Sequence, residues 1–347
     1  MVGPLHTLQL PLGARMERYG EWELPADYGD PIAEHRAVRE SVGLLERAPR
    51  AFICVSGSDR FSWMQGMVSN DVRILESGVT SIQSCALDST GHLLADLTIV
   101  SFGDYLVLDM DRINGEKVYQ LLDQFLIVED VDLAPESDLF CLSLQGPDVT
   151  EKAVRGWAES ESGTLAVPAD HTGEGGFDLY VRGESGIQQL WLTIVESGIR
   201  PVGESAAEIL RIEAGIPRYG VDMDETTIAL EAGLENSHIS HTKGCYVGQE
   251  IIHRIHSRGH TNRALTGFFV DGDGPPPPKE KLYSTDSDSA REVGWITSGI
   301  FYSPTLQRTI AMGYLRHELR EEGTVLRTET GLSLTVTELP FYGQRDK

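Results

Sequence analysis

The sequence lacks the features that define several large classes of protein. It has only four cysteines, and no two of them form a C-x-x-C pair, which argues against a disulfide framework and a four-thiolate zinc site. No apolar run reaches the roughly 18 residues of a membrane-spanning helix. The first residues lack a basic start followed by a long apolar core, which predicts a cytoplasmic protein. The cysteines are Cys54, Cys85, Cys141 and Cys245.

Positive charge is also scarce. The 347 residues include 29 Lys+Arg and 53 Asp+Glu, a formal net charge of −24, so we expect neither nucleic acid nor an anionic membrane surface as a direct partner. The phosphate-loop patterns G-x-G-x-x-G and G-x-x-x-x-G-K-[ST] are missing, as is the G-x-S-x-G pattern of nucleophile-elbow hydrolases. The 40% hydrophobic and 24% charged residues are typical of a globular chain, here long enough for about two or three domains.

The order of apolar patterns predicts an α+β body followed by an all-β module. Residues 31–50 have apolar positions at helical spacing, and residues 81–110 form strand-like runs around the turn DSTGH. A second round of helices and strands occupies residues 150–235. After the proline-rich stretch DGDGPPPP at 271–278, interpreted as a connector, short strands at regular spacing predict a small antiparallel barrel.

The stretch 241–265 contains the most unusual chemistry. Lys243 stands two residues from Cys245, and a neighbouring cation can lower the pKa of a thiol. The basic residues here reverse the global charge and suit an anionic ligand. The alternative is a tight turn with an inert cysteine and a solvated basic strand. The residues concerned are Lys243, Gly244, Cys245, Gly248, Gln249, Glu250, Arg254, Arg258 and Arg263.

Two carboxylates lie inside apolar runs that we expect to be strands. Asp96 interrupts LLADLTIV, where a buried carboxylate needs a partner or a cavity. Asp178 in GGFDLYV shares a strand face with Tyr180, and its carboxylate could accept two hydrogen bonds from a planar N–H edge, such as that of a pterin. The alternative for both carboxylates is an outward-facing position in solvent.

Three histidines, His253, His256 and His260, occur at spacings of three and four residues. On a helix they would share a face and could hold zinc. However, Gly259 interrupts the segment, IIHRI has the composition of a strand, and no carboxylate at a familiar offset completes the set. His238 and His241 have the same weakness, so the sequence predicts no metal site.

The motif KGCYVGQE at 243–250, which includes Tyr246, resembles that of YgfZ-type folate-binding proteins. These are relatives of GcvT, the glycine cleavage T-protein or aminomethyltransferase. The similarity runs from about Tyr28 to Phe341 and includes EHRAVRESVGLLE, LLADLTIV, HTGEGGFDLYV and LRIEAGIPRYGVDMDE.

The resemblance implies an α+β, GcvT-like three-lobed ring with a C-terminal antiparallel β-barrel domain. The folate-binding body would span 20–265 in two lobes, the second lobe covering about 51–135, and the barrel would span 266–347. The ligand implied is tetrahydrofolate or a derivative. Asp96 would lie near the reactive nitrogens of folate, Asp178 and Tyr180 at the pterin, and Arg254 or Arg258 at the carboxylated tail.

Two departures from the T-protein pattern favour the YgfZ branch. Ala207 replaces an arginine that precedes the L-R-L-E-A-G segment, and T-proteins lack KGCYVGQE. We therefore expect a protein that assists iron–sulfur cluster assembly or repair and matures tRNA-modifying iron–sulfur enzymes, with Cys245 as nucleophile or transient ligand.

The alternative is a folate-dependent one-carbon transferase, an aminomethyltransferase or a demethylase. In that activity, Asp96 would stabilise positive charge or orient a proton transfer. A third interpretation is a non-enzymatic module that binds folate or docks a protein.

Overall fold

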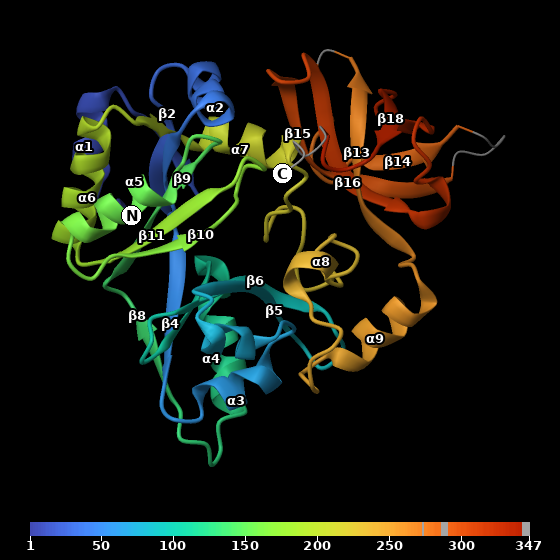
Figure 1. Cartoon of the computed structure of the whole chain (residues 1–347). Coiled ribbons are helices and arrows are strands. Elements are labelled where there is room, and N and C mark those ends of the chain that lie inside the picture. The colour runs from blue at the N-terminus through green and yellow to red at the C-terminus, as the bar shows by residue number, and fades with distance from the viewer. Residues whose placement is uncertain (273, 286–290, 342–347) are drawn as a thin grey trace. The chain divides into compact units, whose positions relative to one another are not determined.

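The computed structural model describes residues 1–272, 274–285 and 291–341 (Figure 1). The chain divides into two compact units, and it passes between them several times. The last residues of the expected barrel domain, 342–347, lie outside the described part, as do residue 273 of the expected connector and residues 286–290. The first unit comprises Met1–Trp63, Arg73–Ile82 and Leu97–Leu210, and the second comprises Met64–Val72, Gln83–Asp96 and Arg211–Lys347.

Two five-stranded sheets organise the first unit. One has the strand order β10-β11-β9-β3-β12, in which β12 and β3 run parallel and the other pairs run antiparallel. Trp191 and Ile194 of α6 pack with Leu142 and Leu144 of β9, which buries one face of this sheet. The elements are β3 (Gly43–Glu46), β9 (Leu139–Gln145), β10 (Leu165–Pro168), β11 (Gly176–Arg182), β12 (Arg200–Val202), α5 (Glu151–Ser160) and α6 (Glu184–Glu196).

The other sheet has the order β5-β6-β7-β4-β8, and β5 and β6 each continue into the second unit. Phe52 of β4 and Val107 of β7 share an apolar cluster with Cys141 and Tyr180 of the first sheet. The elements are β4 (Arg50–Ser56), β5 (Ser81–Leu87), β6 (Leu93–Ser101), β7 (Leu106–Asp111), β8 (Asp132–Glu136) and α4 (Gly115–Gln124). The remaining elements that begin in this unit are α1 (His6–Gln9), β1 (Arg15–Tyr19), β2 (Trp22–Asp27), α2 (Pro31–Glu40), α3 (Arg60–Met67) and α7 (Glu204–Glu213).

The expected helical spacing over 31–50 is wrong beyond residue 40. Helix α2 starts where the Asp30 side chain accepts hydrogen bonds from the backbone N–H groups of Ile32 and Ala33, and it ends at Glu40. Leu44 and Leu45 then lie in β3, which is buried because it is an inner strand of its sheet. A continuous apolar run of this kind fits a buried strand and a helix equally well, so spacing alone cannot separate them.

In the second unit, α8 (Glu235–His238) and α9 (Gln249–Arg258) precede the barrel. The expectation that IIHRI is a strand is wrong, because this segment forms the central half of α9. Gly248 and Gly259 adopt left-handed conformations at the two ends of the helix, with φ of 80° and 82°. These glycine caps, and not the β-branched isoleucines, determine the local structure.

Six antiparallel strands of the second unit close into a barrel of order β13-β16-β15-β14-β17-β18. Its core contains Phe268, Leu282, Leu315 and Leu334. The proline-rich stretch joins β13 to β14 and therefore lies within the barrel, and not before it as the sequence suggests. The strands are β13 (Arg263–Asp271), β14 (Lys281–Ser284), β15 (Glu292–Ser303), β16 (Arg308–Arg316), β17 (Val325–Thr328) and β18 (Ser333–Thr337).

The predicted α+β fold with a C-terminal antiparallel barrel is confirmed. The three-lobed ring and the division at residues 265/266 stay predictions. No helix among the described residues combines the length and the hydropathy that crossing a membrane requires.

Candidate functional site

Asp96 lies in β6 and is half-buried within the apolar strand. Its charge acts on two groups of the second unit, the Cys85 thiol and the Tyr219 hydroxyl. Burial is the main cause of the raised pKa of both groups, and the negative charge of Asp96 adds to it. Both groups are therefore neutral at pH 7 and place no charge of their own beside the carboxylate of Asp96.

The motif loop, residues 243–250, contributes Tyr246 to the apolar cluster that contains Cys85. Tyr246 of the loop and Ile252 of α9 pack with Cys85, Leu87 and Leu93 from the ends of β5 and β6. The Tyr246 hydroxyl is buried and has no hydrogen-bond partner among the described residues. Burial, followed by the nearby Cys85, raises the pKa of Tyr246 to about 12.

Lys243 and Gly248 fix the motif loop in place. The Nζ atom of Lys243 donates to the backbone carbonyls of Val68 and Asn70 at 2.6 and 2.7 Å. A Cβ atom on Gly248 would lie 2.5 Å from the carbonyl oxygen of Asp88, so this close approach requires glycine. The buried lysine thus anchors the loop to the segment that follows α3.

The other residues of the motif loop are more accessible. Cys245 is an exposed free thiol, and Gly244 and Glu250 are also exposed. Gln249 opens α9, with its Nε2 atom 2.9 Å from Nε2 of His253. Arg254, the candidate for the folate tail, is exposed on the same helix.

Asp178 lies in β11 of the first unit and is buried. The Nε2 atom of His171 is 3.0 and 2.9 Å from its two carboxylate oxygens. Burial raises the pKa of Asp178, but the charge and hydrogen bond of His171, together with Arg47 and Ser143, lower it more, so that the pKa is about 2. Asp178 is therefore ionised at neutral pH and already has a partner.

Tyr180 is fully buried on the same strand, and its hydroxyl donates to Oδ2 of Asp109 at 2.7 Å. Asp109 in turn accepts a bond of 2.6 Å from Nε of Arg50. Asp109, Cys141 and Asp178 bring their ligand atoms within 4.8 Å of one another. Sequence reasoning missed Asp109 and His171, because one lies on another sheet and the other in a loop.

The described residues fit tetrahydrofolate in part. The half-buried Asp96 and the partnerless Tyr246 hydroxyl offer polar contacts beside apolar side chains, as a pterin requires. Asp178 and Tyr180 belong to the first unit, whereas Asp96, Cys245 and Arg254 belong to the second. That all five line a single folate pocket stays a prediction.

The architecture defines the class of the protein, an α+β body followed by a closed C-terminal barrel. The family model of the GCVT N-terminal domain matches residues 5–238, and that of the glycine cleavage T-protein C-terminal barrel domain matches residues 263–343. The chain therefore belongs to the GCVT family. Aminomethyltransferases of this family use tetrahydrofolate, which confirms the cofactor expected from the sequence.

Relatives named aminomethyltransferase align with nearly the whole chain. That of Rubrobacter xylanophilus is 29% identical and covers 99% of this chain and 94% of its own length. That of Bordetella parapertussis is 32% identical over 90% of this chain and 87% of its own length. The crystal structure of the glycine cleavage system aminomethyltransferase T from Bartonella henselae matches with a TM-score of 0.85 and 22% identity over 99% of both chains, which supports the fold.

These relatives correct the function expected from the sequence. The YgfZ-like role in iron–sulfur cluster assembly and tRNA-modifying enzymes is wrong, because the relatives along the whole chain are aminomethyltransferases. Iron–sulfur client enzymes are likewise unsupported as partners. Ala207, taken as a departure from T-proteins, packs against an apolar cluster with Val38, Leu45 and Val202. The YgfZ prediction relied on the eight residues of KGCYVGQE and on Ala207, whereas the similarity to aminomethyltransferases extends along the whole chain.

Proposed function

We propose that the protein is a tetrahydrofolate-dependent one-carbon transferase of the aminomethyltransferase type. The observation that carries this proposal is the alignment with aminomethyltransferases through both domains, over 99% of this chain and 94% of the relative. The body and the barrel would then act as one enzyme.

Asp96 is the proposed catalytic carboxylate. Tetrahydrofolate, when bound, supplies the nitrogen atoms that accept the one-carbon unit. Because Cys85 and Tyr219 remain neutral, they add no negative charge beside Asp96, and its carboxylate would stabilise positive charge on the bound folate. Its half-buried position strengthens that interaction relative to water.

The remaining predicted residues would bind and orient the folate. Asp178 is ionised and has lone pairs beyond those that face His171, so it can accept further bonds from a pterin edge. Tyr180 would act behind it, through Asp109, since its hydroxyl is fully buried. The exposed guanidinium of Arg254 suits the carboxylates of the folate tail.

The test is transfer of a one-carbon unit from candidate aminomethyl donors to tetrahydrofolate, followed by chromatography of the folate products. We expect Asp96→Asn to lower kcat on the order of a hundredfold while tetrahydrofolate still binds in calorimetry. Asp104→Asn, a change at an exposed carboxylate, is the matched control and should leave turnover unchanged. Normal turnover by Asp96→Asn would remove Asp96 from the mechanism, and absence of tetrahydrofolate binding by the unmodified chain would contradict the proposal.

The YgfZ-like motif is a feature within this proposal and carries no separate function. We propose that the loop places Cys245 beside the folate site, supported by the buried anchor Lys243 and by the packing of Tyr246 with Cys85. Cys245→Ala in the same assay tests the thiol. A large loss of kcat supports a catalytic thiol, whereas full activity would assign the loop a positioning role alone.

A further inference from the structure

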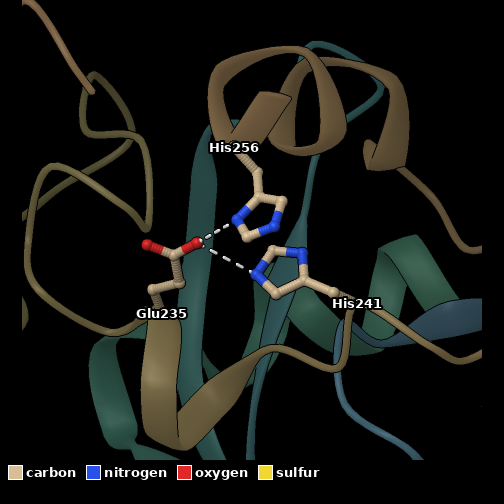
Figure 2. A group of neighbouring side chains, drawn as sticks. All are labelled: Glu235, His241 and His256. Carbon is tan, nitrogen blue, oxygen red and sulfur yellow. Dashed lines mark hydrogen bonds and ion pairs between the residues drawn. The ribbon is translucent and has the colours of Figure 1, made fainter. Parts of the chain in front are cut away.

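Three side chains of the second unit bring two imidazole rings to one carboxylate (Figure 2). Glu235 begins α8, His241 precedes the motif loop, and His256 lies in the last turn of α9. Oε1 of Glu235 is 3.0 Å from Nε2 of His241 and 2.7 Å from Nδ1 of His256. A single carboxylate oxygen therefore faces one nitrogen from each ring. We call these three residues the histidine cluster.

The two rings of the histidine cluster are stacked, with centroids 3.8 Å apart and an angle of 20° between their planes. The two nitrogens and the carboxylate oxygen all lie within 4.8 Å of one another. A tetrahedral zinc ion with ligands at about 2.0–2.1 Å needs ligand separations of about 3.4 Å. The present separations of 2.7 and 3.0 Å are hydrogen-bond distances shorter than this value, so the stacked rings must turn until the lone pair of each nitrogen points at the ion within its own ring plane.

We propose that Glu235, His241 and His256 bind one divalent cation of the zinc class. Two imidazole nitrogens and one carboxylate oxygen match the ligands of Zn²⁺ and similar transition metals, whereas Mg²⁺ and Ca²⁺ prefer oxygen ligands alone. On binding, each ring turns an unprotonated nitrogen to the ion and keeps its proton on the other nitrogen. Three protein ligands leave a fourth position for water.

Access from solvent supports an exchangeable ion at this place. The side chains of Glu235, His241 and His256 are 35%, 24% and 51% exposed. A carboxylate with two neutral imidazoles carries one negative charge, which favours a divalent cation. The site is therefore open enough to take up an ion and carries the charge to attract one.

The ion would connect the two flanks of the motif loop. His241 lies two residues before Lys243, and His256 lies six residues after Glu250, so one ion would close the segment that carries Cys245. Such a closure would restrict the loop. This site is separate from the proposed transferase activity and does not depend on it.

The experiment is a calorimetric titration of the full chain with Zn²⁺ after chelator treatment and dialysis. We expect one equivalent of Zn²⁺ per chain, and visible absorption bands of tetrahedral coordination when Co²⁺ is the probe. Glu235→Gln and His256→Ala should each weaken binding at least about tenfold. His260→Ala is the matched control, because His260 is exposed, stacks on His317 and lies outside the cluster.

Circular dichroism checks that each variant is folded, and His256→Gln gives a second test at the same position. Binding that stays intact in both Glu235→Gln and His256→Ala would overturn the proposal. So would loss of binding in His260→Ala alone, or saturation by Mg²⁺ as strongly as by Zn²⁺. No heat and no Co²⁺ absorption with the unmodified chain would show that the cluster is only a hydrogen-bonded group.

Discussion

Two clusters gather potential ligands at similar separations, and they differ in their access to solvent. In the first unit the cluster is Asp109, Cys141 and Asp178, and in the second unit it is the histidine cluster. The side chains of Asp109 and Asp178 are 2% and 4% exposed, whereas those of the histidine cluster are between 24% and 51% exposed. Distance alone would assign both clusters the same role.

The partners of the two clusters explain why their roles differ. Asp109 already receives a hydrogen bond from Arg50, and Asp178 lies within hydrogen-bond distance of His171, so both buried carboxylates have partners inside the protein. The carboxylate of Glu235 instead faces two imidazoles that bind protons or metal ions reversibly. A buried carboxylate with partners inside the protein is closed to an added ion, whereas an open group with exchangeable partners can accept a ligand.

The largest expected effect on stability comes from Asp178→Ala, which breaks the buried cluster. This change leaves His171 without its partner beside an apolar core, and we expect a loss of about 3 kcal/mol in the free energy of unfolding. The loss falls at the lower end for buried pairs because the side chain of His171 keeps 21% of its exposure. Urea unfolding at pH 7 measures it.

Asp138→Ala, a change at an exposed carboxylate, is the control and should cost less than about 0.5 kcal/mol. Equal stability of Asp178→Ala and the unmodified chain would mean that the buried pair contributes nothing. The contrast between the two clusters would then have no energetic basis.

The structure also shows where sequence reasoning reaches its limit. Asp96 and Asp178 stand out in the sequence because each is a carboxylate inside an apolar strand pattern. The surroundings of these carboxylates cannot be seen in the sequence. Asp178 meets Cys141 only through the pairing of β11 with β9, and Asp109 lies on another sheet. Pairing between distant strands leaves no local periodicity to detect.

The histidine cluster was missed for a related reason. The sequence contains His256 at helical spacing from other histidines, but its carboxylate, Glu235, lies 21 residues away. The strand-like composition of IIHRI also hid the helix that presents His256. The body and barrel could be predicted because their patterns are local, whereas the clusters depend on how loops return to the helices.

The next largest effect should come from acid, which protonates the buried carboxylate of Asp178. The pKa of Asp178 is about 2 in the folded protein and about 3.9 in an unfolded chain, so its contribution to stability is full above about pH 5 and falls as pH drops towards 2. We expect about 2 kcal/mol of stability to disappear over this range. Asp178→Asn cannot titrate here and should show a shallower decline in urea unfolding between pH 5 and pH 2.5. If the free energy of unfolding fell in parallel in Asp178→Asn and in the unmodified chain, the loss of stability could not be assigned to the Asp178 carboxylate.

A smaller effect should come from Tyr180→Phe. This change removes the bond of 2.7 Å to Asp109 but leaves the bond from Arg50, so we expect a loss of about 1 kcal/mol in the free energy of unfolding. Tyr302→Phe, at a side chain that is exposed, is the control and should change little. A loss as large as that of Asp178→Ala would mean that Arg50 does not hold Asp109 in place.

The smallest effect on stability should come from replacing the exposed thiol of Cys245. The reactivities of Cys245 and Cys141 should nevertheless differ strongly. Cys245→Ser should change the free energy of unfolding by less than about 0.5 kcal/mol because the side chain is exposed. Burial, with the nearby Asp178 and Asp109, raises the pKa of Cys141, so a thiol reagent should label Cys245 in the folded protein and Cys141 only after unfolding. Peptide mapping after brief labelling measures both sites. Rapid labelling of folded Cys141 would mean that the buried cluster opens to solvent, and the distinction between a closed and an exchangeable cluster would fail.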